Sequence, residues 1–137
     1  MEMFTNITNG FVEDILMLRS KQPPSPLQEG RHEEIKRDAP NTPGIYAIFH
    51  KDNLKCFYVG SSVKSIRERL KMHYGKDAEK DYREKLGQLR NPENFYYWYY
   101  EIVCPTTLDK QDFKCLIAMV EAMCSAAWKP DVPSYKF

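Results

Sequence analysis

The chain has 137 residues, enough for one compact domain with a core and too few for two. Its formal net charge is only +1, no run approaches the roughly 20 apolar residues of a membrane span, and the N-terminus does not resemble a signal peptide. These features argue against a membrane or secreted protein, so we expect a soluble cytoplasmic one.

The charge is distributed unevenly along the chain. Residues 51–90 contain 11 Lys or Arg against 6 Asp or Glu, whereas the segments on both sides are slightly acidic. A local basic excess in a nearly neutral protein is typical of a surface that contacts a polyanion. A charge-rich helix is more often simply a solvated face, so charge alone leaves both interpretations open.

Residues 1–41 are predicted to form an arm outside the main domain. Apolar residues over 11–18 favour a short helix, and the prolines of 23–26 favour an extended linker after it. The domain itself is expected to span residues 42–137.

The domain starts with two β-rich runs, GIYAIFH at 44–50 and KCFYVG at 55–60, which predict an antiparallel hairpin. An odd-numbered loop between them would place Tyr46 and Tyr58 on one face, and a loop of three residues would set them directly opposite. Gly60 would let a backbone or a ligand approach the end of the second strand closely.

Helical spacing follows over 62–74 and 78–89, then a third strand rich in aromatic residues over 95–103, which we expect to be central in the sheet. Core packing of these rings is preferred over a base-stacking platform. A long helix should follow, opened by a capping pattern at 106–109 and ending near Trp128. The prediction is an α/β fold of the α+β type: a small three-stranded antiparallel sheet flanked by helices in the order β-β-α-α-β-α, with an N-terminal helical arm.

Glu121 is the only charged residue between Lys114 and Lys129. A carboxylate in such an apolar helix must face solvent or have a partner, because burial of an unpaired charge is strongly unfavourable. Two interpretations therefore stand equal, a solvent-facing position and a metal ligand or acid–base group at the floor of a cleft.

Arg69 and His73 are four residues apart, so they share a face of the helix predicted over 62–74. That face adjoins the apolar stripe of Ile66 and Leu70, which places both residues at the boundary between core and solvent.

These motifs occur in a familiar order: PGIY at 43–46, YVG at 58–60, RERLKMHY at 67–74 and Glu121 in a late helix. In this order and spacing the chain resembles the GIY-YIG nuclease family over about residues 42–133. The resemblance implies a metal-dependent endonuclease domain that cleaves phosphodiester bonds, with a small antiparallel sheet flanked by helices.

Carried over position by position, the resemblance implies a catalytic set of Tyr46, Tyr58, Arg69, His73 and Glu121. Glu121 would hold one Mg²⁺, for which Mn²⁺ could substitute, and Arg69 would contact the scissile phosphate. Tyr46 would take or relay the proton of the attacking water, and Tyr58 would orient the water or a phosphate oxygen. His73 matches a histidine found in many members.

The residues expected to contact substrate lie around this set. Two of them depart from the family pattern: Ser134 falls where many members have asparagine, and Ser61 stands where some have lysine, a role that Lys64 could take in space. The expected DNA-binding residues are Gly60, Ser61, Lys64, Arg67, Lys71, Lys76 and Ser134.

The resemblance therefore predicts an endonuclease acting on DNA, duplex or branched, in the cytoplasm or at the nucleoid and without a membrane partner. The N-terminal arm would suit a homodimer, because one site cuts one strand. Two other classes remain open: a catalytically inactive nucleic-acid-binding module that keeps the fold, and a protein-interaction module.

Overall fold

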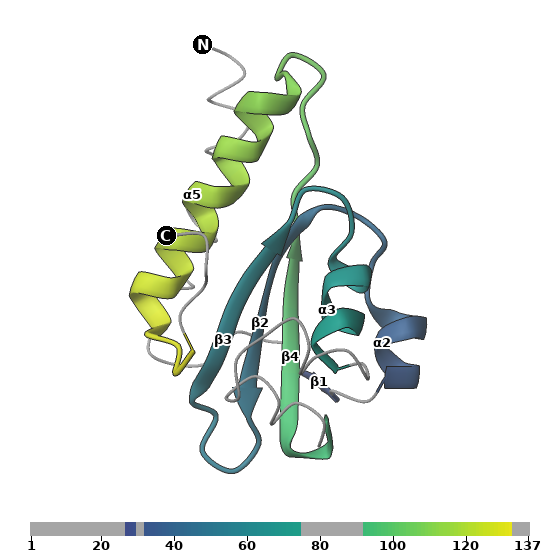
Figure 1. Cartoon of the computed structure of the whole chain (residues 1–137), viewed down its shortest axis with the longest axis vertical. Helices are drawn as coiled ribbons and strands as arrows, with labels where there is room; N and C mark the ends of the chain where they lie inside the picture. The colour runs from purple at the N-terminus through teal and green to yellow at the C-terminus, as the bar shows by residue number, and fades with distance from the viewer. Residues whose placement is uncertain (1–26, 30–31, 75–91, 133–137) are drawn as a thin grey trace.

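The structure is a computed structural model that describes residues 27–29, 32–74 and 92–132 (Figure 1). Its strands form one antiparallel sheet, and helices pack on both faces, so the α+β prediction is confirmed. The helix expected over 78–89 lies outside the described residues. The elements in chain order are β1 (Gln28–Glu29), α2 (His32–Asp38), β2 (Gly44–His50), β3 (Cys56–Ser62), α3 (Ile66–Tyr74), the 3-10 helix η2 (Pro92–Asn94), β4 (Phe95–Glu101) and α5 (Lys110–Trp128).

The strands lie in the order β1-β4-β2-β3. Strand β2 pairs along its length with β3 on one side and β4 on the other, whereas β4 is bordered on its outer side only by the two residues of β1. The aromatic strand β4 is therefore inside the sheet, as predicted, but the first strand of the hairpin is the one with a full-length partner on each side, and β1 adds a short fourth strand.

The hairpin places Tyr46 and Tyr58 on the same face, as expected, but not directly opposite one another. Tyr46 faces Gly60 and Ile48 faces Tyr58, so the two rings are diagonal neighbours with centroids 6.3 Å apart. The loop has five residues rather than three, and the register shifts between Ile48 and Phe49. Both features move the turn relative to a symmetrical three-residue loop.

The sheet has a buried cluster on each face. The rings of Tyr46 and Tyr58 belong to the cluster under α2 and α3, and α5 covers the other cluster (Figure 1). Residues that alternate along a strand point to opposite faces, which is why neighbouring positions of β2 fall in different clusters. The α2/α3 cluster includes Ile35, Ala39, Tyr46, Ile48, Tyr58, Ile66 and Leu70, and the α5 cluster includes Ile45, Ala47, Val59, Trp98, Phe113, Ile117, Val120 and Cys124.

Part of the predicted arm contacts the domain. Strand β1 pairs with β4, and the α2 residues Ile35 and Ala39 are fully buried in the α2/α3 cluster. The residues before Leu27, including the helix and linker expected there, lie outside the described ranges. The division of the chain at residue 41 therefore stays a prediction.

Helix α5 begins with a capping residue other than the one expected. Asp109 is the N-cap, and its carboxylate accepts a hydrogen bond from the Asp112 backbone N–H at 2.8 Å. The sequence pattern had suggested Thr106, but the three residues before Asp109 form a turn instead. The predicted end of the helix at Trp128 is confirmed.

After α5 the chain returns to the edge strand. The backbone N–H groups of Asp131 and Val132 donate to β3 carbonyls at 3.2 and 3.0 Å. The Asp131 carboxylate contacts His50 Nε2 at 3.0 Å and Lys55 Nζ at 3.2 Å. Burial alone would raise the pKa of Asp131, but hydrogen bonds from His50 and Lys55 outweigh it and lower the pKa. This contact fastens the end of α5 to the hairpin.

Within the described ranges, none of the helices combines the length and apolar character that crossing a lipid bilayer requires.

Candidate active site

The glycine of the YVG motif makes room for the tyrosine of the GIY motif. Gly60 lies opposite Tyr46, whose ring crosses onto β3. A Cβ atom at position 60 would collide with the Tyr46 hydroxyl oxygen and Cζ, and would lie 2.9 Å from Cε2. Tyr46 is 0 % exposed and Tyr58 3 % exposed. The two motifs are therefore interlocked, with the phenol of one seated on the backbone of the other.

The glycine of the GIY motif is also required by its surroundings. Gly44 has a φ of +156°, and a Cβ there would lie 2.8 Å from Ile66 Cδ1 and 3.0 Å from Glu101 Cα. This close packing fixes the start of β2 against both β4 and α3.

Glu121 is buried. Its side chain is 1 % exposed on the inner face of α5, and its Oε1 accepts a hydrogen bond from Ser61 Oγ at 2.5 Å. Of the two interpretations of this residue, the solvent-facing one is wrong. A short hydroxyl–carboxylate bond is the kind that holds a buried charge in one position.

Cys124, one turn beyond Glu121 on α5, is also buried. Burial, and to a smaller extent the charge of Glu121, raise the pKa of the Cys124 thiol to about 12. This thiol therefore stays protonated at neutral pH and does not act as a nucleophile.

Strand β3 joins the two halves of the predicted catalytic set. Tyr58 and Gly60 belong to the face covered by α2 and α3, and Ser61 meets Glu121 of α5 on the other face. Neighbouring residues of a strand point to opposite sides, so the tyrosine pair lies on one face of the sheet and the Glu121 carboxylate on the other, with the edge strand between them.

Arg69 lies in α3, half-buried, beside the core residue Leu70. Its Nη1 contacts the Met72 sulfur at 3.9 Å. The predicted helix is confirmed here, so Arg69 and His73 do share a helix four residues apart. The side chain of His73 lies outside the description.

Helix α3 is anchored directly after the YVG strand. The Ser65 backbone N–H donates to Ser62 Oγ at 2.8 Å, and Ser65 Oγ accepts from the Glu68 backbone N–H at 3.2 Å. Such serine caps satisfy the free N–H groups of a helix start and fix where the helix begins. The position of Arg69 relative to the hairpin follows from this cap.

The residues predicted to contact DNA fall into different environments. Gly60 and Ser61 are buried, and Lys64 is exposed. Arg67 Nε donates to the Ala39 carbonyl at 2.7 Å, and Lys71 Nζ lies 3.6 Å from a Glu68 carboxylate oxygen. Lys76 and Ser134 lie outside the described residues. Roles in DNA contact stay predictions for all seven.

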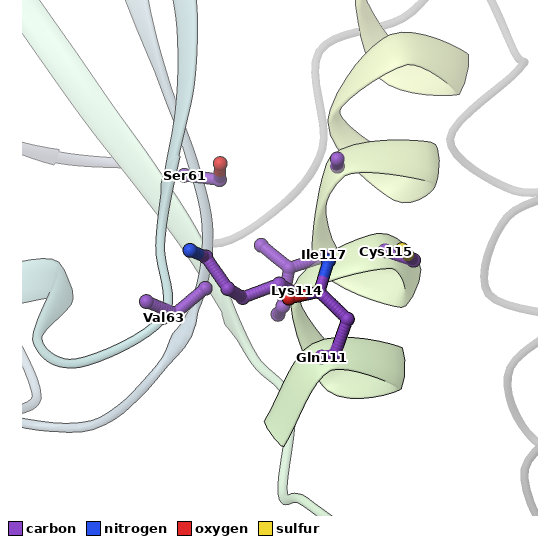
Figure 2. Close-up of a pocket in the computed structure, with 7 residues that line it drawn as sticks. Ser61, Val63, Gln111, Lys114, Cys115 and Ile117 are labelled. Carbon is purple, nitrogen blue, oxygen red and sulfur yellow. The ribbon is translucent and has the colours of Figure 1, made fainter. Parts of the chain in front are cut away.

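A pocket of about 300 Å³ lies between the end of β3 and the first half of α5 (Figure 2). Ser61 contributes to its lining, so the pocket adjoins the residue that holds Glu121. Lys114, which also lines the pocket, is not among the site residues predicted from the sequence. Its spacing of seven residues from Glu121, two helical turns, does indicate that both lie on one side of the helix. The labelled lining residues are Ser61, Val63, Gln111, Lys114, Cys115 and Ile117.

Comparison with known proteins agrees with this arrangement. A family model described as the GIY-YIG catalytic domain matches residues 42–110, which is half of the chain. The match includes both tyrosine motifs and Arg69 and stops before Glu121. No match was found among curated proteins, and none among solved structures. GIY-YIG domains are in general nuclease domains that act on nucleic acids. The two motifs interlock in the hairpin, and the family model matches half of the chain. The chain therefore belongs to the GIY-YIG family.

Proposed function

We propose that the protein is a metal-dependent endonuclease that hydrolyses phosphodiester bonds in DNA. The observation that supports this most is the buried carboxylate of Glu121, held by Ser61 one residue after the YVG motif. Burying a carboxylate to 1 % exposure in an apolar helix lowers the stability of the fold. Binding a cation would give this buried carboxylate a function.

The proposed metal is Mg²⁺, for which a single carboxylate oxygen is a suitable protein ligand. In the ranges 27–29, 32–74 and 92–132 no group of three or more His, Cys, Asp or Glu residues could together hold an ion. Zinc sites need such nitrogen and sulfur clusters, whereas Mg²⁺ often binds through one or two carboxylates and keeps its waters. Glu121 would hold the ion. When bound, the ion would supply positive charge to the phosphate and lower the pKa of a water.

The other residues would act on the phosphate and on the proton. Arg69 would place a permanent, forked positive charge on phosphate oxygens. Tyr46 would accept or relay the proton of the attacking water, and Tyr58 would orient that water or an oxygen. Both phenols are buried, on the sheet face opposite Glu121, so this proposal requires that their cover move for substrate to reach them. His73 would complete the set from the last turn of α3.

The substrate would be duplex or branched DNA. Residues 51–90, with their excess of basic side chains, would contact the backbone, and Lys64 is exposed beside the hairpin. Cleavage of both strands would be served by a homodimer formed through the N-terminal arm. An enzyme acting on such DNA would work in the cytoplasm or at the nucleoid.

The test is a cleavage panel with the full chain. Supercoiled plasmid, linear duplex, branched DNA, single-stranded DNA and RNA would be incubated with Mg²⁺, Mn²⁺ or EDTA. We expect cleavage of a DNA substrate with either ion and none with EDTA, and loss of cleavage in Arg69→Ala. Cleavage that is indifferent to EDTA would remove the metal from the proposal, and cleavage of RNA alone would replace the substrate.

A second candidate is a nucleic-acid-binding module that has lost catalysis. The full burial of Tyr46 favours it, because a covered phenol does not reach a substrate phosphate. Salt-dependent DNA binding without cleavage under any metal condition would select this candidate over the endonuclease.

A further inference from the structure

The pocket beside Ser61 combines apolar walls with convergent polar groups. Lys114 and Gln111 approach it from α5, and Ser61 from β3 (Figure 2). Figure 2 shows the Lys114 side chain crossing from the helix toward Val63, with its amino group at the rim on the Ser61 side. Pockets of this size, mostly apolar with a few placed polar groups, are the usual form of small-ligand sites.

The pocket and the buried carboxylate share a residue. Ser61 lines the pocket and also donates to Glu121, so the two sites are adjacent. Lys114 precedes Glu121 by seven residues, which places both on nearly the same side of α5 about 10 Å apart along the axis. One side of α5 therefore carries a cation that lines the pocket with Ser61 and a carboxylate that is hydrogen-bonded to Ser61.

The charge of this pocket suits an anion. No acidic residue contributes to its lining. Among the residues that the structure describes, none of the ion pairs involves Lys114. A lysine ammonium is a compact point charge that pairs readily with phosphate, and the aliphatic walls offer contact to a sugar or a base edge.

We propose that this pocket binds a nucleotide unit of the substrate strand, with Lys114 pairing with its phosphate and Gln111 donating to a phosphate or sugar oxygen. The proposal rests on the proposed function, because it identifies the ligand as part of the nucleic acid that Glu121 acts on. Lys114 is then a substrate-positioning residue that sets where the strand lies relative to Glu121.

The test measures DNA binding in EDTA, where the strand stays intact, as a function of salt. Lys114→Met removes the charge and keeps a side chain of similar length along the apolar wall. Lys110→Met is the matched control, because Lys110 is an exposed lysine one turn earlier on α5 that does not line the pocket. Fluorescence anisotropy of a labelled duplex from 50 to 200 mM KCl gives the affinity and its salt slope.

Loss of one phosphate contact lowers the slope of log K against log salt by about 0.9 for duplex DNA. For Lys114→Met we therefore expect weaker binding than the parent, with the difference shrinking about 3.5-fold between 50 and 200 mM KCl. Lys110→Met should keep the slope of the parent. Ala118→Trp, which adds a bulky ring to an exposed residue of the pocket lining, should weaken binding without changing the protein's charge.

Equal slopes for Lys114→Met and Lys110→Met, or unchanged binding by Ala118→Trp, would overturn the pocket assignment. If the parent nevertheless cleaves DNA with metal, the proposed endonuclease stands without it. If Lys114→Met lowers the slope of log K against log salt and the parent cleaves nothing, the pocket assignment holds and the proposed endonuclease activity is wrong. A chain that binds no nucleic acid at all overturns both.

Discussion

Replacement of Gly60 by alanine tests whether the two tyrosine motifs are interlocked. The new Cβ would collide with two atoms of the Tyr46 phenol and lie 2.9 Å from a third. The ring is 0 % exposed, so it has no open space into which to move. Overpacking of this kind costs about 1–3 kcal/mol, and three ring atoms in contact favour the upper half of that range.

One effect opposes this cost. Gly60 does not have a positive φ, so alanine fits the backbone and stabilises by about 0.4–1 kcal/mol through the unfolded chain. The net loss is then about 2 kcal/mol. With a urea m-value of about 2 kcal/mol per M, the unfolding midpoint should fall by about 1 M.

A double-mutant cycle isolates the contact. Tyr46→Leu removes the ring, so Gly60→Ala should cost less in that background, with a coupling of about 1–2 kcal/mol measured by urea unfolding. Additive costs, within about 0.5 kcal/mol, would refute the interlocked arrangement.

Three further outcomes follow from the site and its surroundings. Ser61→Ala should destabilise the protein by about 1.5–3 kcal/mol in urea unfolding, since the buried Glu121 carboxylate loses a hydrogen-bond donor. The loss of stability should be smaller in a Glu121→Gln background. An equal loss there would count against the hydrogen bond between Ser61 and Glu121. In the native state at pH 8, a thiol reagent should modify two of the four cysteines quickly and Cys56 and Cys124 slowly, because burial raises the pKa of both thiols; four equal rates would contradict their burial. The pKa of Asp131 is lowered in the fold, so its contribution to stability is present above about pH 4 and is lost as the pH falls through the lowered value. Asp131→Asn should therefore be less stable than the parent at pH 7 and should lose less stability than the parent between pH 5 and pH 2. Parallel stability profiles of the two proteins against pH would contradict this.

Much of the fold could be predicted because its signals are local. The β-rich runs around Tyr46 and Tyr58, the spacing of Ile66 and Leu70, and the long apolar stretch around Glu121 each specify one element. The structure confirms those elements.

Other features depend on contacts between distant segments, which local patterns do not report. The hairpin register depends on a five-residue loop and a shift after Ile48, and the sequence does not reveal such irregularities. Strand β1 has two residues, too few for any period, and forms because β4 offers it an open edge. His50 ends β2 and pairs with Asp131, 81 residues away, a contact that no local pattern reports.

The candidate site likewise has features that local sequence patterns predict and features that depend on contacts between distant segments. Glu121 could be singled out from its apolar neighbours, but whether it was buried or exposed depended on the side of α5 that meets the sheet. The sequence predicts a substrate contact for Ser61 but not its hydrogen bond to Glu121, 60 residues away. A pairing across that separation in sequence depends on the packing of α5 against β3.

The most direct test of the account is nicking of supercoiled plasmid by Glu121→Gln. Glutamine keeps the size of the side chain and an oxygen for Ser61 but removes the charge that would hold Mg²⁺. We predict that the parent nicks plasmid with Mg²⁺, that the variant loses this activity at least a hundredfold while keeping a cooperative urea transition, and that both bind DNA in EDTA. Nicking by a folded Glu121→Gln at the rate of the parent would contradict the assignment of this buried carboxylate as the catalytic metal ligand.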